Sequence, residues 1–291
     1  MHPSAVQALL CPVCADSFDV PASGAGALVC GSGHSFDIAK QGYINLLTGV
    51  ATRFTPDSAA MVEARSAFLA AGHYEPLADA LARIVASQLP AGPGSTPGIR
   101  PADLVVDAGT GTGYYLEHIR RLLDVASVGL DISKYALRRA ARTNPETVNL
   151  VWDIWRPLPL AAGSAAAVVV VFAPRNAPEF ARILRPGGIL AVATPLPGHL
   201  AEIAGPTGLL GLQENKHEAL ASSMAGFFRA GHTQDLEYQL ALDREDVLRV
   251  ATMGPAGHHL DVSDVRARVA GLPETSQVSA RFRISLFEKA A

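Results

Sequence analysis

Short apolar runs alternate with segments of helical spacing between residues 103 and 193, and this alternation predicts the core of the fold. The runs predict five strands, and the segments between them predict three helices. The predicted strands are Leu104–Asp107, Ser127–Asp131, Val148–Trp152, Ala166–Phe172 and Gly188–Ala193. The predicted helices are Tyr114–Leu123, Lys134–Thr143 and Pro178–Leu184. Apolar strands joined by crossover helices are typical of an α/β protein with a parallel, doubly wound sheet.

Further elements are predicted on both sides of this region. The capping sequence Thr55–Ser58 predicts a helix over Ser58–Ala71, and Pro76 begins a second helix that ends near Leu89. The Pro- and Gly-rich segment Pro90–Gly98 is expected to be a linker. After residue 200 we expect two strands and two helices that complete the sheet. These are Leu236–Leu242, Glu245–Met253, Ser263–Ala270 and Arg281–Phe287.

Composition and charge narrow the class of protein. With 291 residues, 49% of them hydrophobic, the chain can bury a large core. The apolar run Ala165–Ala173 is much shorter than the roughly 20 residues of a membrane span, and the sequence shows no signal peptide. We therefore expect a cytoplasmic protein with no membrane partner. The net charge of -3 is no global nucleic-acid signature, so a polyanion would have to bind a local patch.

Positive charge gathers in one such patch. The predicted helix after the second strand carries Lys134, Arg138, Arg139 and Arg142, and Arg53 and Arg65 lie near the connector. A helical run of charge is either a solvated face or a contact for an anionic partner, and the sequence leaves both interpretations open.

The N-terminal residues have the spacing of a metal site. Cys11 and Cys14 form a CxxC pair, and Cys30 and His34 form a CxxxH pair. Two such pairs can bind one tetrahedral Zn²⁺, and four protein ligands leave no open position, so the ion would be structural. The fifteen residues between the pairs are expected to form a short hairpin. The alternative is three free or buried thiols and an unrelated histidine.

A glycine-rich turn follows the first predicted strand. Asp107 is followed by Gly109, Gly111 and Gly113, which is neither a Gly-x-Gly-x-x-Gly dinucleotide loop nor a phosphate-binding loop ending in Gly-Lys-Ser/Thr. Together with Asp131 at the end of the second strand, the turn resembles motif I of class I S-adenosylmethionine methyltransferases, which have a Rossmann-like sheet.

That resemblance implies roles for three acids. Asp107 and the glycine turn would hold the methionine portion of the cofactor, Asp131 would accept from the ribose hydroxyls, and Asp153 after the third strand would take the adenine amino group. Asp131 can instead cap the helix that begins at Ser133, and Asp153 can be a surface loop acid.

Five motifs in the same order resemble the bacterial 23S ribosomal RNA (guanine-N1)-methyltransferases over most of the chain to about residue 200. They are the Cys/His quartet, Phe36–Leu47, Arg65–Tyr74, the Asp107 glycine loop and Thr194–Leu200. In that family a zinc domain helps to recognise a hairpin of 23S rRNA, the class I domain methylates a guanine, and some members confer resistance to macrolides of the tylosin and mycinamicin type. Homodimers also occur in it.

The resemblance also implies ligands. It makes the quartet zinc ligands and puts Tyr74, Gly111, Thr112 and His199 around the cofactor. The sequence alone leaves two alternatives open: Tyr74 can be an ordinary core residue, and His199, in a loop after the fifth strand, can face solvent. We expect a zinc-ribbon-like RNA-recognition module at 1–50, a helical connector with the linker at 51–100, and a class I methyltransferase domain at 101–291.

The chemistry of guanine N1 requires a base, because this nitrogen carries a proton at neutral pH. Asp153 and His199 are the candidates. The turn Phe172–Asn176 after the fourth strand is expected to hold the target base, with Phe172 and Pro174 against the ring and Arg175 and Asn176 at its edge. Two alternatives stay open: a small-molecule methyltransferase with a structural zinc module, and a non-catalytic zinc-dependent RNA or protein adaptor.

Overall fold

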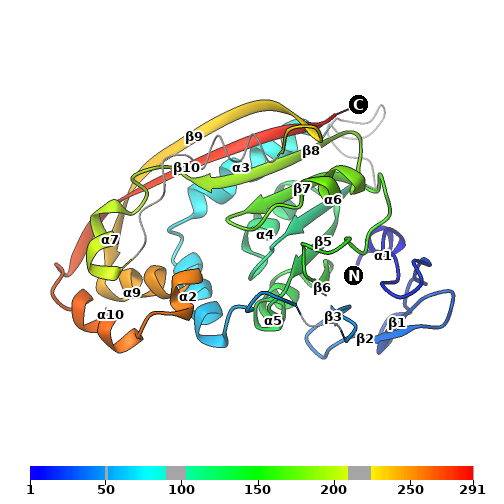
Figure 1. Cartoon of the computed structure of the whole chain (residues 1–291), viewed down its shortest axis with the longest axis horizontal. Coiled ribbons are helices and arrows are strands. Elements are labelled where there is room, and N and C mark those ends of the chain that lie inside the picture. Colours follow the sequence, from blue (N-terminus) through cyan, green and yellow to red (C-terminus); the bar gives the residue numbers. More distant parts are fainter. Residues whose placement is uncertain (50–51, 90–102, 209–223, 291) are drawn as a thin grey trace.

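The main feature of the fold is one eight-stranded sheet with the order β3-β6-β5-β4-β7-β8-β10-β9 (Figure 1). The computed structural model describes residues 1–49, 52–89, 103–208 and 224–290, and the predicted linker Pro90–Gly98 lies outside them. The strands of this sheet are β3 (Tyr43–Asn45), β4 (Leu104–Ala108), β5 (Ala126–Asp131), β6 (Val148–Val151), β7 (Ala165–Val171), β8 (Leu184–Pro195), β9 (Phe228–Asp243) and β10 (Thr275–Lys289).

The five strands predicted between residues 104 and 193 are confirmed as β4 to β8, and they run parallel. The C-terminal strands also join the sheet, but β10 pairs antiparallel with both β8 and β9. Because β5 and β6 lie on one side of β4 while β7 lies on the other, the chain reverses direction across the sheet at the β4/β7 boundary. In doubly wound sheets, ligands bind outside the carboxyl ends of the strands at this point.

Side chains of the central strands alternate between two hydrophobic layers. Val105 of β4 and Val169 of β7 pack in one layer, and Val106 and Val168 pack in the other. The first layer is covered by α3 (Glu75–Gln88) and α4 (Tyr114–Leu122), the second by α6 (Ala177–Ile183) and the N-terminal module. This period of two is what a parallel sheet buried on both faces requires.

The predicted helices are confirmed with boundaries that shift by a few residues. Ser58 caps α2 (Ala59–Ala70) by accepting a hydrogen bond from the backbone N–H of Met61, as the capping sequence predicts. The other helices are α1 (Pro3–Gln7), α5 (Lys134–Thr143), α7 (Ala201–Thr207), α9 (Arg244–Thr252), α10 (Val262–Val269) and the 3-10 turn η1 (Pro255–His258). Of these, α1, α7 and η1 were not predicted. Within the described residues, no helix is long and apolar enough to cross a bilayer.

The N-terminal module is joined to the large sheet. Its regular hairpin, β1 (Ala27–Val29) with β2 (Ser35–Asp37), encloses the Cys30 turn, whereas the sequence placed a hairpin within the fifteen residues before it. β3 then leaves the module and pairs parallel with β6, with Ile44 opposite Leu150. Module side chains such as Leu9 share one buried cluster with the β4, β7 and β8 strands. The module and the α/β domain are therefore joined by a shared sheet and a shared hydrophobic core.

The C-terminal segment returns to the N-terminal connector. The strands β9 and β10 are long, and α9 lies beside α2 at the far end of the molecule from the N-terminal module, with α10 packed against α9 (Figure 1). Residues after α9 are thereby brought to the carboxyl ends of the central strands.

Candidate functional site

The Cys/His quartet forms a metal-binding cluster. The ligand atoms of Cys11, Cys14, Cys30 and His34 all lie within 4.8 Å of one another. Cys14 Sγ is 3.7 Å from Cys30 Sγ, and Cys30 Sγ is 3.5 Å from His34 Nδ1. A tetrahedral Zn²⁺ with ordinary bond lengths separates two sulfurs by about 3.8 Å and a sulfur from a nitrogen by about 3.6 Å. The donor set fits a structural zinc ion.

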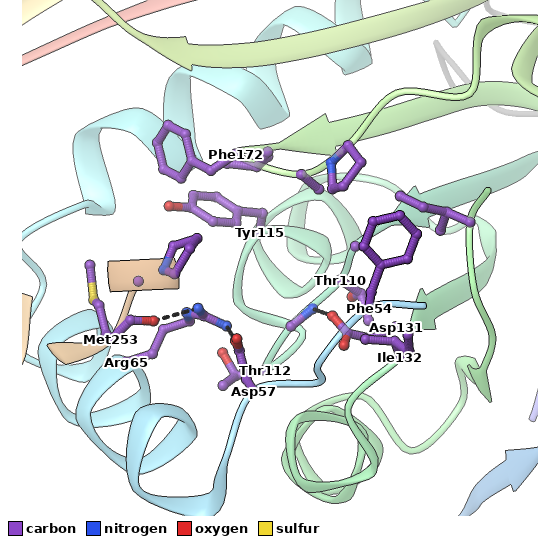
Figure 2. Close-up of a pocket in the computed structure, with 18 of the residues that line it drawn as sticks. Phe54, Asp57, Arg65, Thr110, Thr112, Tyr115, Asp131, Ile132, Phe172 and Met253 are labelled. Carbon is purple, nitrogen blue, oxygen red and sulfur yellow. Dashed lines mark hydrogen bonds and ion pairs between the residues drawn. The ribbon is translucent and has the colours of Figure 1, made fainter. Parts of the chain in front are cut away.

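A cavity of about 440 Å³ lies at the carboxyl ends of β4, β5, β6 and β7 (Figure 2). Of the residues predicted from the sequence to hold the cofactor, six line it: Tyr74, Gly109, Gly111, Thr112, Asp131 and Asp153. The other three, Asp107, Gly113 and His199, lie behind the residues that line the cavity. Apolar atoms dominate the walls, through residues such as Leu69, Ile132, Ile154 and Val171.

The glycine turn brings its backbone against the turn after β7. Gly109 has φ +89°, and a Cβ at this position would lie only 2.3 Å from the Cβ of Ala173. Gly113, with φ +81°, is the N-cap of α4, and a Cβ added there would lie 2.7 Å from Asn144 Nδ2. Glycine is required at both positions. At Gly109 a side chain would clash with the turn on the other side of the crevice, and at Gly113 it would clash with residues packed beneath the crevice.

Asp107 and Thr110 contribute buried polar atoms at the glycine turn. The side chain of Asp107 is 1% exposed. Within the described residues, Oδ2 of Asp107 and Oγ1 of Thr110 have no hydrogen-bond partner. Burial raises the pKa of Asp107 to about 7. A buried acceptor without a partner is costly, and a ligand that brings an N–H donor would relieve that cost.

Asp131 closes β5 and holds the turn in place. Its Oδ2 accepts from Gly111 N at 2.9 Å, and its Oδ1 accepts from Ser133 N at 2.8 Å. Ser133 itself is the N-cap of α5, so Asp131 orients the residue that caps the helix. Burial raises the pKa of Asp131. Its carboxylate still lines the cavity (Figure 2).

Asp153 follows β6 and ties two segments together. Its Oδ2 accepts from Thr52 Oγ1 at 3.0 Å, and its Oδ1 accepts from Trp155 N at 3.0 Å. The side chain is buried but lines the cavity. The interpretation as a solvated surface acid does not describe this position.

Tyr74 and His199, distant in sequence, meet beside the cavity. Tyr74 Oη lies 3.1 Å from His199 Nε2, and Arg281 N donates to His199 Nδ1 at 3.1 Å. Because a backbone N–H only donates, Nδ1 carries no proton and Nε2–H donates to Tyr74. Burial lowers the pKa of His199 to about 4, in keeping with a neutral ring. Tyr74 lines the cavity, and His199 orients it from behind.

The turn after β7 supplies apolar atoms but little polar chemistry to the cavity. Phe172 has φ +54°, is 45% exposed and lines the cavity with Pro174. Asn176 is buried and donates to the carbonyl of Ile154 at 2.8 Å, so its amide N–H serves the fold. Arg175 is half-buried, does not line the cavity, and has its pKa lowered by burial.

The basic helix face is only partly free. Arg139 pairs with Glu63 of α2 and lies 3.4 Å from Ser66 Oγ, so it joins α5 to α2. Lys134, Arg138 and Arg142 are exposed on α5.

Sequence reasoning missed a contact that closes one side of the cavity. Arg65 Nη1 lies 2.5 Å from Asp57 Oδ2, and Arg65 Nη2 donates to the carbonyl of Met253 at 2.5 Å (Figure 2). His258 Nε2 is 3.8 Å from Asp57 Oδ1, and all four residues line the cavity. Arg65 lies in one of the family-like stretches, but no local pattern marks Met253 or His258.

Comparisons with known proteins agree with this geometry. Residues 9–49 match the family model "RlmA, N-terminal", and residues 105–188 match "Methyltransferase domain". The chain is 42% identical to the 23S rRNA (guanine(748)-N(1))-methyltransferase of Streptomyces fradiae, covering 96% of each chain. It is 44% identical, over 99% of each chain, to a Micromonospora griseorubida protein provisionally assigned as a 23S rRNA (guanine-N(1)-)-methyltransferase.

Among solved structures, the chain is similar to the complex of the Haloferax volcanii Trm112 methyltransferase activator with a protein provisionally assigned as a methyltransferase. The TM-score is 0.52 at 18% identity, and the match covers 82% of this chain and 100% of that one. At this identity the likeness concerns the fold alone. The fold is that of a class I methyltransferase with an N-terminal zinc-binding module.

Proposed function

Because the chain belongs to the 23S rRNA (guanine-N1)-methyltransferase family, we propose that it transfers a methyl group from S-adenosylmethionine to N1 of a guanine in a hairpin of 23S rRNA. One observation carries the proposal. Strand β3 of the zinc module pairs with β6 in the same sheet whose strand ends line the cavity at the glycine turn. The S. fradiae relative is named for guanine 748, and we propose the equivalent guanine as the target.

The residues around the glycine turn suit the cofactor. We assign its methionine portion to Asp107 and the turn, its ribose hydroxyls to Asp131, and its adenine to Asp153. The unpartnered Oδ2 of Asp107 lies behind the turn, where an ionised carboxylate suits the positive charge of the cofactor. Asp131 accepts two backbone N–H groups, and an ionised carboxylate can accept about four hydrogen bonds. When bound, the cofactor supplies a methyl group on a positively charged sulfur.

Two side chains are the proposed candidates to accept the guanine N1 proton. Asp153 and His258 both line the cavity, and His258 is the better candidate, because Asp153 is assigned to the adenine and already accepts from Thr52 Oγ1 and Trp155 N. His199, the second candidate from the sequence, is less suited, because its Nδ1 already accepts from Arg281 N and its pKa is lowered to about 4. We assign His199 to orienting the Tyr74 hydroxyl.

The RNA must reach the cavity with its target base unstacked, which single-stranded loops permit at moderate cost. Phe172 and Pro174 offer apolar surface for that base on the β7 side. We propose that the zinc module sets the register of the hairpin.

Three further properties are proposed from the family resemblance: homodimerisation, a cytoplasmic location with the ribosomal substrate, and protection of ribosomes against tylosin- or mycinamicin-type macrolides. Light scattering tests the first and cell fractionation the second. Macrolide susceptibility of a sensitive host that expresses the chain tests the third.

The experiment for the main proposal uses the full-length protein, labelled S-adenosylmethionine and unmodified 23S rRNA. We expect label on the RNA at a single guanine. Cofactor binding without label on RNA would contradict the RNA substrate and favour a small-molecule methyltransferase. Absence of cofactor binding would favour a non-catalytic adaptor.

A further inference from the structure

Two large aromatic side chains are exposed at the rim of the cavity and face each other. Phe54 is 47% exposed and Trp155 is 49% exposed, and both line the cavity. Their ring centroids are 6.3 Å apart, with an angle of 25° between the ring planes. Single exposed rings are common on protein surfaces, whereas contiguous exposed apolar surface beside a cavity is typical of a binding site.

One carboxylate fixes both rings. Trp155 N donates to Asp153 Oδ1, and Thr52 Oγ1 donates to Asp153 Oδ2. Phe54 N in turn donates to Thr52 Oγ1 at 3.2 Å. The backbone that carries each ring is therefore tied to the same buried acid, so the pair is preorganised before any ligand arrives. Preorganisation lowers the entropic cost of binding.

Position and charge identify the ligand. In the view of Figure 2, Phe54 lies on the side of the cavity that carries Asp131 and Ile132, away from Phe172 and Tyr115, and all five residues line the cavity. The target base is assigned to the Phe172 side, so a ring bound at Phe54 and Trp155 is a different one. Arg53 is exposed beside Phe54, which suits a phosphate backbone. Aromatic faces bind unpaired bases of any sequence by stacking.

We propose that Trp155, supported by Phe54, stacks on an unpaired base of the RNA substrate that neighbours the target guanine. The inference rests on the proposed function and adds a second base-binding position to it. The cofactor's adenine is the competing occupant, because the backbone of both rings is tied to Asp153, to which we assign the adenine. The exposure of about half of each ring favours the RNA base.

Tryptophan fluorescence separates these occupants in the unmodified protein. The chain has two tryptophans, of which Trp152 is 6% exposed, so acrylamide quenches mainly Trp155. We expect a 23S rRNA hairpin to protect this emission and S-adenosylhomocysteine alone to leave it unprotected. Trp155→Phe should remove the accessible component and so confirm its assignment. Equal protection by S-adenosylhomocysteine, or no protection by the RNA, would overturn the proposal.

Kinetics provide the second test. Trp155→Ala should raise the KM for RNA roughly 5- to 100-fold, the range that the loss of one stacked base implies. Its affinity for S-adenosylhomocysteine should stay within about twofold of wild type, and Trp155→Phe should restore most of the RNA affinity. Phe227→Ala is the matched control, because Phe227 is 41% exposed and does not line the cavity.

The outcomes distinguish this inference from the proposed function. If the wild-type protein methylates RNA but Trp155→Ala has an unchanged KM for RNA, the stacking position is refuted and the function stands. If Trp155→Ala loses cofactor affinity instead, the ring pair holds the adenine and the inference is wrong. Absence of RNA methylation by the wild type refutes the function itself.

Discussion

Replacing Gly109 by alanine tests whether the crevice between the β4 and β7 turns is the cofactor site. The added Cβ would lie 2.3 Å from the Cβ of Ala173, whereas real Cβ atoms essentially never approach closer than 3.0 Å and ordinary contact begins at 3.4 Å. The two turns must therefore separate by about 1 Å. A displacement of this size at a reacting centre can reduce turnover on the order of a hundredfold.

The substitution also strains the backbone, because Gly109 has φ +89°. An alanine in the left-handed region costs about 1–2 kcal/mol. In a chain of this size each kcal/mol lowers the Tm by roughly 2–4 °C. Gly187→Ala is a matched control: Gly187 has φ +72°, but its added Cβ would meet no atom within 4 Å.

Calorimetric titration with S-adenosylhomocysteine and thermal melts of both variants separate the two effects. Gly109→Ala should weaken binding by roughly tenfold or more, in line with a crevice opened by about 1 Å. Gly187→Ala should lower the Tm through strain and leave binding unchanged. Gly109→Ala binding within twofold of wild type would refute the assignment of the site.

Three further predictions concern the buried titratable groups and the metal. Burial raises the pKa of Asp107 to about 7, so affinity for the cationic cofactor should rise between pH 6 and 8 as this carboxyl ionises. The Asp107→Asn variant should bind the cofactor weakly and with little pH dependence. Cofactor binding by Asp107→Asn that still depends on pH would contradict this prediction. His199 has a pKa lowered to about 4, so the stability that its neutral form contributes above pH 6.5, about 3 kcal/mol, should be lost as the pH falls towards 4. Denaturant titrations of His199→Gln should show that acid sensitivity reduced, and an unchanged profile would argue against a neutral buried ring. Cys30→Ser should abolish zinc binding. Because β3 of the module pairs with β6, the variant should unfold in one cooperative calorimetric transition with a lower Tm. A separate low-temperature transition for the module would contradict this packing.

The central strands and the glycine turn could be predicted because their signals are local. Buried parallel strands are continuous apolar runs, and acids such as Asp107 and Asp131 follow adjacent strands at their carboxyl ends. The zinc ligands were equally accessible, since chelating pairs are defined by short spacings.

The missing parts depend on contacts between distant segments. β9 begins at Phe228, eight residues before the predicted Leu236, because the exposed residues Arg229, Ala230 and Thr233 pair with β10 at the edge of the sheet. β3 is three residues long and is defined by its pairing with β6. Met253 and His258 reach the cavity only because α9 lies beside α2, and no periodicity predicts such packing.

The most direct test of the central claim is the identity and position of the modified nucleotide. The purified protein is incubated with S-adenosylmethionine and unmodified 23S rRNA, and the product is analysed by primer extension and nucleoside mass spectrometry. We predict 1-methylguanosine and a cofactor-dependent stop at the guanine equivalent to 748, since N1 methylation blocks base pairing. An RNA that acquires no methyl group, or one methylated at an atom other than guanine N1, would contradict the account.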